Sequence, residues 1–257
     1  MDLHLRGKRV LITGASKGIG AVAAEAFAEE GANLRLAARN VERLAQVADR
    51  LRSRYQVDVA IHGTDLRNPD DLSALAAAAS DIDVLVNNAG DIPGGTIDKV
   101  DEPAWRHAWE LKVFGFINLT RLIYARMKAR GSGVIINDIG AAGEKFDANY
   151  ICGSAGNAAL MAFTRTLGGK SLKDNIRVVG INPGPVATDR YVTRMQAQAK
   201  AQLGDESRYR ELEQSLPLGR AAKPREIGDL MAFLASDRAG YTSGVIYTVD
   251  GGYSAGW

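Results

Sequence analysis

The chain has 257 residues, 46% of them hydrophobic and 24% charged, which is the composition of an ordinary globular protein and not of a disordered or fibrous one. Its formal charge of +2, from 32 basic and 30 acidic residues, is too small for the field that draws proteins to nucleic acid, so no nucleic-acid partner is expected. The single cysteine cannot form an internal disulfide, no apolar run approaches the roughly 20 residues that cross a bilayer, and the first residues lack the apolar core of a signal peptide, so we expect a cytoplasmic protein without a membrane partner.

Short β-branched runs alternate with alanine-rich stretches along the whole chain. The runs predict seven strands, at residues 9–12, 34–37, 57–61, 84–86, 134–136, 177–180 and 245–249. Apolar residues at intervals of three and four predict helices at residues 21–30, 41–54, 69–79 and 149–169, with a long pair within 105–130. Strands interleaved with helices indicate an α/β fold with a doubly wound parallel sheet, in one domain spanning residues 1–257.

Residues 189–220 differ in character from the rest of the chain. The segment is polar, charged and rich in residues that favour helices. In a sheet protein it is expected to form a small helical lid over a substrate site, and a plain helical excursion on the surface is the alternative.

A glycine-rich loop follows the first predicted strand directly and precedes a helix. Its spacing, G-x-x-x-G-x-G, would also suit an ordinary strand-to-helix corner, but its position after the first strand favours a dinucleotide site. There, glycines let the backbone approach a pyrophosphate at the positive end of the helix. The candidate cofactor residues of this loop are Gly14, Ser16, Lys17, Gly18, Ile19 and Gly20.

The end of the second predicted strand bears on the choice of cofactor. A protein that uses NAD(H) would place a carboxylate there to bind the ribose 2′-hydroxyl, and Ala38 stands in its place. Arg39 follows, and Lys17 lies near the same corner, so two cations can converge on a 2′-phosphate. The pattern favours NADP(H), and the alternative is two solvated surface charges.

Several motifs occur in the order found in one enzyme family: T-G-x-x-x-G-x-G, Asp65-Leu66, Asn87-Asn88-Ala89-Gly90, Tyr150, Pro183-Gly184-Pro185-Val186 with Thr188, and Asp250-Gly251-Gly252. Through them the chain resembles the short-chain dehydrogenases/reductases over nearly its whole length. The resemblance implies a Rossmann-type fold in which Asp65 and Leu66 hold the adenine, and Asn88, Ala89 and Gly90 line the adenosine ribose. It also implies that Pro183, Gly184, Val186 and Thr188 hold the nicotinamide end.

The same resemblance implies a catalytic tyrosine that exchanges a proton with the substrate oxygen. In the family a lysine one helical turn later lowers the tyrosine pKa, a serine orients the substrate and an asparagine completes a water relay. Tyr150 matches the tyrosine, but Ser154 stands at the lysine position, Gly140 at the serine position and Lys112 at the asparagine position.

Loss of the neighbouring lysine changes what Tyr150 can do. A cation about 4 Å from a phenolate contributes on the order of 4 kcal/mol, so without it Tyr150 is expected to stay largely protonated. Ser154 lies on the same helix face and can bond a ribose hydroxyl without bringing a charge. We hypothesise that Lys112 extends inward and replaces the missing cation. Alternatively it reaches solvent or pairs with Glu110.

These observations leave three functions open. The first is an NADP(H)-dependent oxidoreductase that interconverts a small-molecule carbonyl and a secondary alcohol, the second a non-catalytic NADP(H)-binding regulatory protein, and the third a lyase or isomerase. The three histidines have no ligand spacing, so no metal site is expected. The long apolar helices within residues 105–130 and 149–169 resemble subunit-packing helices of the family and predict a homotetramer, with a dimer as the alternative.

Overall fold

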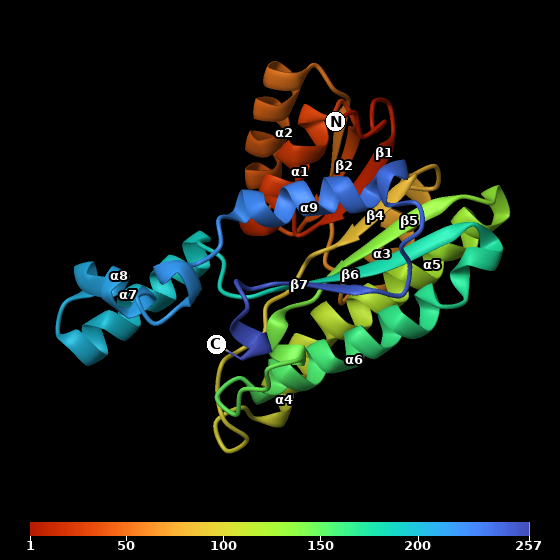
Figure 1. The fold of residues 1–257 in the computed structure, drawn as a ribbon. Coiled ribbons are helices and arrows are strands. Elements are labelled where there is room, and N and C mark those ends of the chain that lie inside the picture. Colours follow the sequence, from red (N-terminus) through yellow and green to blue (C-terminus); the bar gives the residue numbers. More distant parts are fainter. Residues whose placement is uncertain (257) are drawn as a thin grey trace.

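Seven parallel strands form one sheet in the computed structural model, which describes residues 1–256 and not Trp257, the last residue of the predicted domain (Figure 1). The strand order is β3-β2-β1-β4-β5-β6-β7. The prediction of a doubly wound parallel sheet is confirmed. The strands are β1 (Arg9–Thr13), β2 (Asn33–Ala38), β3 (Val59–Gly63), β4 (Val84–Asn87), β5 (Gly133–Asp138), β6 (Ile176–Pro183) and β7 (Ile246–Val249).

Helices cover both faces of the sheet, which explains why its central strands are apolar throughout. Helices α1, α2 and α9 pack on one face and α3, α5 and α6 on the other (Figure 1). None of the helices within residues 1–256 is both long and apolar enough to cross a membrane. The helices are α1 (Gly18–Glu29), α2 (Val41–Tyr55), α3 (Pro69–Ala78), α4 (Glu102–Trp109), α5 (Gly115–Arg130), α6 (Ile151–Gly168), α7 (Asp189–Leu203), α8 (Tyr209–Glu213) and α9 (Pro224–Ala235).

Two features of the helices go beyond the sequence expectations, whereas the segment 189–220 is helical as expected. The predicted pair within residues 105–130 is a continuous run in which a π-helical turn, Glu110–Phe114, joins α4 to α5. Helix α9 has no counterpart among the predicted elements. The segment 189–220 contains α7 and α8, which project from the body of the molecule in Figure 1.

The strand order places the candidate site. From β1 the chain proceeds to β2 and β3 on one side, then returns to β4 on the other side of β1. Ligands of open α/β sheets bind at such a reversal, outside the carboxyl ends of the strands. In this chain that edge carries the glycine-rich loop after β1, the Asn-Asn-Ala-Gly turn after β4 and the loops after β5 and β6.

Candidate active site

The loop after β1 and the first turn of α1 approach their neighbours so closely that two residues have to be glycine, one in each. A Cβ atom on Gly14, whose φ is +69°, would lie 2.8 Å from Asn88 Nδ2 and 2.9 Å from Ala89 Cα. A Cβ on Gly20 would lie 2.5 Å from Asn88 Nδ2 and 2.6 Å from the Gly14 carbonyl oxygen. The backbone thus forms a tight cradle at the start of α1, which suits a pyrophosphate.

The turn after β4 supports this cradle. The Asn88 side chain donates from Nδ2 to the Thr13 carbonyl at 2.8 Å, and Thr13 Oγ1 accepts from the amides of Asn88 (3.0 Å) and Ala89 (3.2 Å). The Asn88 amide group is therefore engaged with the backbone of the glycine loop, and the residue fixes the shape of the cradle.

The two predicted phosphate-binding cations lie exposed at the ends of their elements. Lys17 is the residue before α1, and Arg39 follows β2. Neither forms an ion pair with any of residues 1–256. Asp65 forms an ion pair with Arg67, whose Nε donates to the carboxylate at 2.9 Å. This contact lowers the pKa of the Asp65 carboxyl group, and the charge of Arg39 adds a smaller lowering. Lys17 and Arg39 thus remain available to an added phosphate.

The other predicted cofactor residues occupy the same edge of the sheet with different degrees of burial. Leu66 and Val186 are buried in the core, whereas Ser16 and Ile19 are partly exposed. A Cβ on Gly18 would lie 3.5 Å from Thr188 Cγ2, so the glycine loop and the loop after β6 are neighbours. Thr188 is also the N-cap residue of α7: its Oγ1 accepts a hydrogen bond from the Tyr191 amide at 3.4 Å.

Tyr150 stands immediately before α6 in an apolar setting. Its ring lies directly over Gly153, where a Cβ would clash with it, and packs on the cluster that contains Ile92 and Cys152. Burial raises the pKa of Tyr150, and the guanidinium groups of Arg190 and Arg194 oppose this shift only in part. The hydroxyl therefore stays protonated at neutral pH and can donate a proton.

Ser154 serves a structural purpose in the loop before α6. Its Oγ accepts from the Asp147 amide at 3.1 Å and lies 3.4 Å from the Asp147 carbonyl, and its side chain is buried. The serine thus fastens the loop at Asp147 to α6.

A buried amide occupies the neighbourhood of Gly140. Asn157 donates from Nδ2 to the Gly140 carbonyl at 3.3 Å and is 2% exposed. A Cβ on Gly140, whose φ is +129°, would lie 2.8 Å from the same nitrogen. Asn157 therefore takes the space that a serine side chain at Gly140 would need. Asn157 was not among the site residues predicted from the sequence, although a polar residue two turns after Tyr150 in an apolar helix was a usable signal.

This arrangement predicts that restoring the serine destabilises the protein. Gly140→Ser combines an unfavourable φ with the contact to Asn157, so we expect a loss of about 3 kcal/mol in the free energy of unfolding. Chemical denaturation measures it. Adding Asn157→Ala should recover part of the loss, because the contact disappears and the backbone strain remains.

Gly131→Ser is the matched control, since Gly131 also has a positive φ (+72°) but has open space around its Cα. Its cost should be about 1 kcal/mol. Equal costs for the two single variants would show that Asn157 does not restrict the Gly140 position.

Lys112 lies in the π-helical turn and points inward, neither to solvent nor to Glu110. Its Nζ donates to the Ile139 carbonyl, and a Cβ on Gly90 would lie 3.0 Å from its Cδ. The carboxylate whose charge acts on Lys112 is Asp138, at the end of β5. The cations whose charges act most on the pKa of Tyr150 are Arg190 and Arg194.

The first turn of α7 is anchored to the loop after β4. Arg190 donates from Nη2 to the Ile92 carbonyl at 2.9 Å, and its Nη1 lies 3.0 Å from an Asp91 carboxylate oxygen. These contacts place the start of the predicted lid beside Tyr150, which packs against Ile92.

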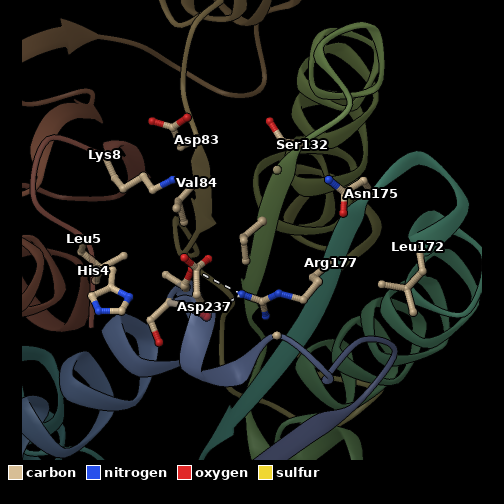
Figure 2. Close-up of a pocket in the computed structure, with 15 residues that line it drawn as sticks. His4, Leu5, Lys8, Asp83, Val84, Ser132, Leu172, Asn175, Arg177 and Asp237 are labelled. Atoms are coloured by element: carbon tan, nitrogen blue, oxygen red, sulfur yellow. Dashed lines mark hydrogen bonds between the residues drawn. The ribbon is translucent and has the colours of Figure 1, made fainter. Parts of the chain in front are cut away.

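A hollow at the opposite edge of the sheet is unrelated to this site. It lies where β4, β5 and β6 begin, and Asp83 and Arg177 line it (Figure 2). Arg177 Nη2 donates to the carbonyls of Ala235 and Ser236, at 3.3 and 3.0 Å. The buried guanidinium thus holds the end of α9 against the sheet.

The parallel sheet with a glycine cradle at its reversal point defines an α/β protein of the dinucleotide-binding type. A family model described as enoyl-(acyl carrier protein) reductase matches residues 14–254. The 7alpha-hydroxysteroid dehydrogenase of Escherichia coli (strain K12) is 34% identical over 257 residues, which cover 98% of this chain and 96% of that protein. The chain belongs to the short-chain dehydrogenase/reductase family.

Solved structures agree with this assignment. L-sorbose reductase from Gluconobacter frateurii, complexed with NADPH and L-sorbose, is 36% identical and superimposes with a TM-score of 0.92 over 98% of each chain. A 7α-hydroxysteroid dehydrogenase complexed with NADH and 7-oxo glycochenodeoxycholic acid is 31% identical, with a TM-score of 0.86 over 98% of this chain and 96% of that one. Related proteins thus bind either nicotinamide dinucleotide.

Proposed function

We propose that the protein is an NADP(H)-dependent oxidoreductase that interconverts a small-molecule carbonyl and a secondary alcohol. The observation that carries the proposal is the glycine cradle beside two cations, Lys17 and Arg39, that form no ion pair within residues 1–256, in a chain of this family. The relatives named above are a reductase of a sugar and a dehydrogenase of a hydroxysteroid, which supports the reaction class.

The cofactor residues fit the proposed group. The close backbone of Gly14 and Gly20 suits a pyrophosphate, and Lys17 and Arg39 suit a 2′-phosphate, because Ala38 offers no carboxylate to a 2′-hydroxyl. Asp65, Leu66, Asn88–Gly90 and the loop from Pro183 to Thr188 would shape the remaining length of the site. When bound, the dinucleotide supplies or accepts the hydride.

The chain's own side chains would donate the proton and cover the substrate. Tyr150 has a protonated hydroxyl at neutral pH, which suits donation to a carbonyl oxygen during reduction. Residues 189–220 would cover the substrate, with Arg190 fixing the first turn of this lid.

A second candidate is an NADP(H)-binding protein without hydride chemistry. The observation that favours it is the structural use of the positions around Tyr150: Ser154 fastens a loop, and Asn157 fills the space beside Gly140. On this alternative the cradle binds the dinucleotide and the protein responds to it by a change of shape or partner.

Oxidation of NADPH across a panel of ketones, aldehydes and quinones separates the two candidates. We expect at least one ketone or aldehyde to be reduced, and Tyr150→Phe to lower kcat by about 100-fold or more while NADPH still binds. Binding of NADPH without turnover of any panel member would favour the second candidate.

The homotetramer expected from the long helices is a separate proposal. Light scattering of the purified chain should give about four times the mass of the 257-residue polypeptide. A monomeric mass would contradict it.

A further inference from the structure

The motif Asp250-Gly251-Gly252, which has no place in the proposed chemistry, forms a tight turn after β7. The Asp250 carboxylate accepts from the Gly252 amide at 2.9 Å with one oxygen and from the Ser254 amide at 2.7 Å with the other. Gly251 and Gly252 both have a positive φ, +71° and +90°, which favours glycine. The carboxylate and the two glycines thus fix the shape of residues 250–254, which we call the Asp250 turn.

The Asp250 turn packs against two parts of the candidate active site. A Cβ on Gly184, in the loop after β6, would lie 2.7 Å from the Asp250 Cβ and 3.1 Å from the Asp250 Cα. A Cβ on Gly251 would lie 2.7 Å from the Cβ of Pro217, near the end of the predicted lid. The turn therefore contacts both the loop proposed to hold the nicotinamide and the end of the lid.

A third contact joins the Asp250 turn to the loop before α6. Lys145 Nζ donates to the Tyr253 carbonyl at 2.8 Å and lies 3.6 Å from the centroid of the Tyr253 ring, so one ammonium group binds two parts of the same residue. Beside it, Glu144 accepts from Thr248 Oγ1 in β7 at 2.6 Å. Two neighbouring side chains of this loop thus bind β7 and the turn that follows it.

The loop before α6 also leads directly to Tyr150. The Tyr150 amide donates to the Asp147 carbonyl at 3.0 Å, and the Asp147 amide donates to Ser154 Oγ at 3.1 Å. Lys145 precedes Asp147 closely in the sequence. A displacement of Lys145 is therefore passed to Tyr150 through a short length of hydrogen-bonded backbone.

We propose that Lys145 is a positioning residue for Tyr150, and that it acts by anchoring the loop before α6 to the Asp250 turn. Because the turn also contacts Gly184 and Pro217, this anchor holds the proton donor, the loop after β6 and the end of the lid in one arrangement. The inference rests on the proposed function for its effect on catalysis, whereas the anchor itself is a property of the protein without ligands.

Hydrogen–deuterium exchange followed by mass spectrometry tests the anchor without substrate or cofactor. Lys145→Met keeps an unbranched apolar stem but removes the donor and the charge, so the amides of residues 144–150 and 250–254 should exchange about fivefold faster or more. Peptides from α2 provide the internal reference, because α2 packs on β2 and β3, at the opposite edge of the sheet from β7. Unchanged exchange in residues 144–150 and 250–254 would overturn the proposal.

Lys170→Met is the matched control for the loss of one lysine. Lys170 is exposed and lies at the far end of α6 from Tyr150, and a helix of 18 residues is about 27 Å long. The control variant should leave exchange in both segments unchanged. Equal acceleration in Lys145→Met and Lys170→Met would contradict an anchor at Lys145.

Conservative changes separate the two contacts of the anchor. Lys145→Arg keeps a cation that can donate to a carbonyl and lie over a ring, so it should restore slow exchange. Tyr253→Ala removes the ring and leaves the carbonyl, so its exchange rates should be intermediate. If Lys145→Arg exchanged as fast as Lys145→Met, the contacts with Tyr253 would not provide the anchor.

Activity provides the readout specific to positioning. For any carbonyl that NADPH reduces, Lys145→Met should lower kcat by about 10-fold, because a small displacement of the proton donor slows the chemical step. The KM for NADPH should change by no more than about twofold, since the glycine cradle and the cations after β1 and β2 are not displaced. Lys145→Arg should restore most of kcat.

Two results decide between failure of the positioning role and failure of the proposed function. Faster exchange in Lys145→Met with an unchanged kcat would overturn the positioning role. If no carbonyl of the panel is reduced, the proposed function fails, while the exchange rates still decide whether Lys145 anchors the loop.

Discussion

Gly20→Ala should destabilise the protein by about 3 kcal/mol and weaken the binding of NADPH by about 100-fold. The new Cβ would lie 2.6 Å from the Gly14 carbonyl oxygen, a backbone atom that cannot move without displacing the cradle. A displacement of about 1 Å in a site that positions a ligand is enough for an effect of this size. Thermal unfolding without ligand and calorimetric titration with NADPH measure the two losses, and a fall of about 10 °C in the melting temperature is expected.

Gly18→Ala provides the comparison within the same first turn of α1. Its φ is +60°, which is unfavourable for alanine, but its Cβ would meet only Thr188 Cγ2 at an ordinary 3.5 Å. The cost should be about 1 kcal/mol, from the backbone alone. If Gly20→Ala were as well tolerated as Gly18→Ala, close approach at Gly20 would not shape the cradle.

Arg39→Ala should weaken NADPH binding by about 10- to 100-fold and change NADH binding by no more than about twofold. The reason is that a charge-assisted hydrogen bond to a phosphate contributes about 1.5 to 3 kcal/mol, and NADH lacks the 2′-phosphate. Arg39→Asp should go further and reverse the preference, since a carboxylate repels the phosphate and accepts from a 2′-hydroxyl. Parallel calorimetric titrations with both dinucleotides give the ratio.

Arg50→Ala is the control for the loss of one positive charge. Arg50 is exposed near the middle of α2, more than a Debye length of about 8 Å along the helix from the site. It should leave both affinities unchanged. An equal loss in Arg39→Ala and Arg50→Ala would mean that net charge, and not a phosphate contact, governs binding.

The sheet was predictable because its strands are short, β-branched and regularly spaced. Buried parallel strands read as apolar runs, and each predicted strand overlaps a strand of the structure. Helix α9 was missed although Pro224 in its first turn and the spacing of Ile227, Met231 and Leu234 were available signals. The π-helical turn lay beyond prediction, since it depends on how α4 and α5 pack and leaves no mark in apolar periodicity.

The glycine cradle was predictable because its function demands specific residues at fixed positions after a strand. The surroundings of Tyr150 were not predictable to the same degree. The sequence suggested Lys112 as a relocated cation. The charges that act on Lys112 include that of Asp138, at the end of β5. The direction of the Asp138 side chain could not be predicted, because a shift of one residue in a strand reverses the face to which a side chain points. The role of Ser154 likewise depends on the path of the loop at Asp147.

Calorimetric titration of the unmodified protein with NADPH and with NADH tests the account most directly. Two cations with no ion-pair partner among residues 1–256 should favour the phosphorylated dinucleotide by about 100-fold. Equal affinity for both dinucleotides, or binding of neither, would contradict the central claim that Lys17 and Arg39 hold the 2′-phosphate of NADP(H).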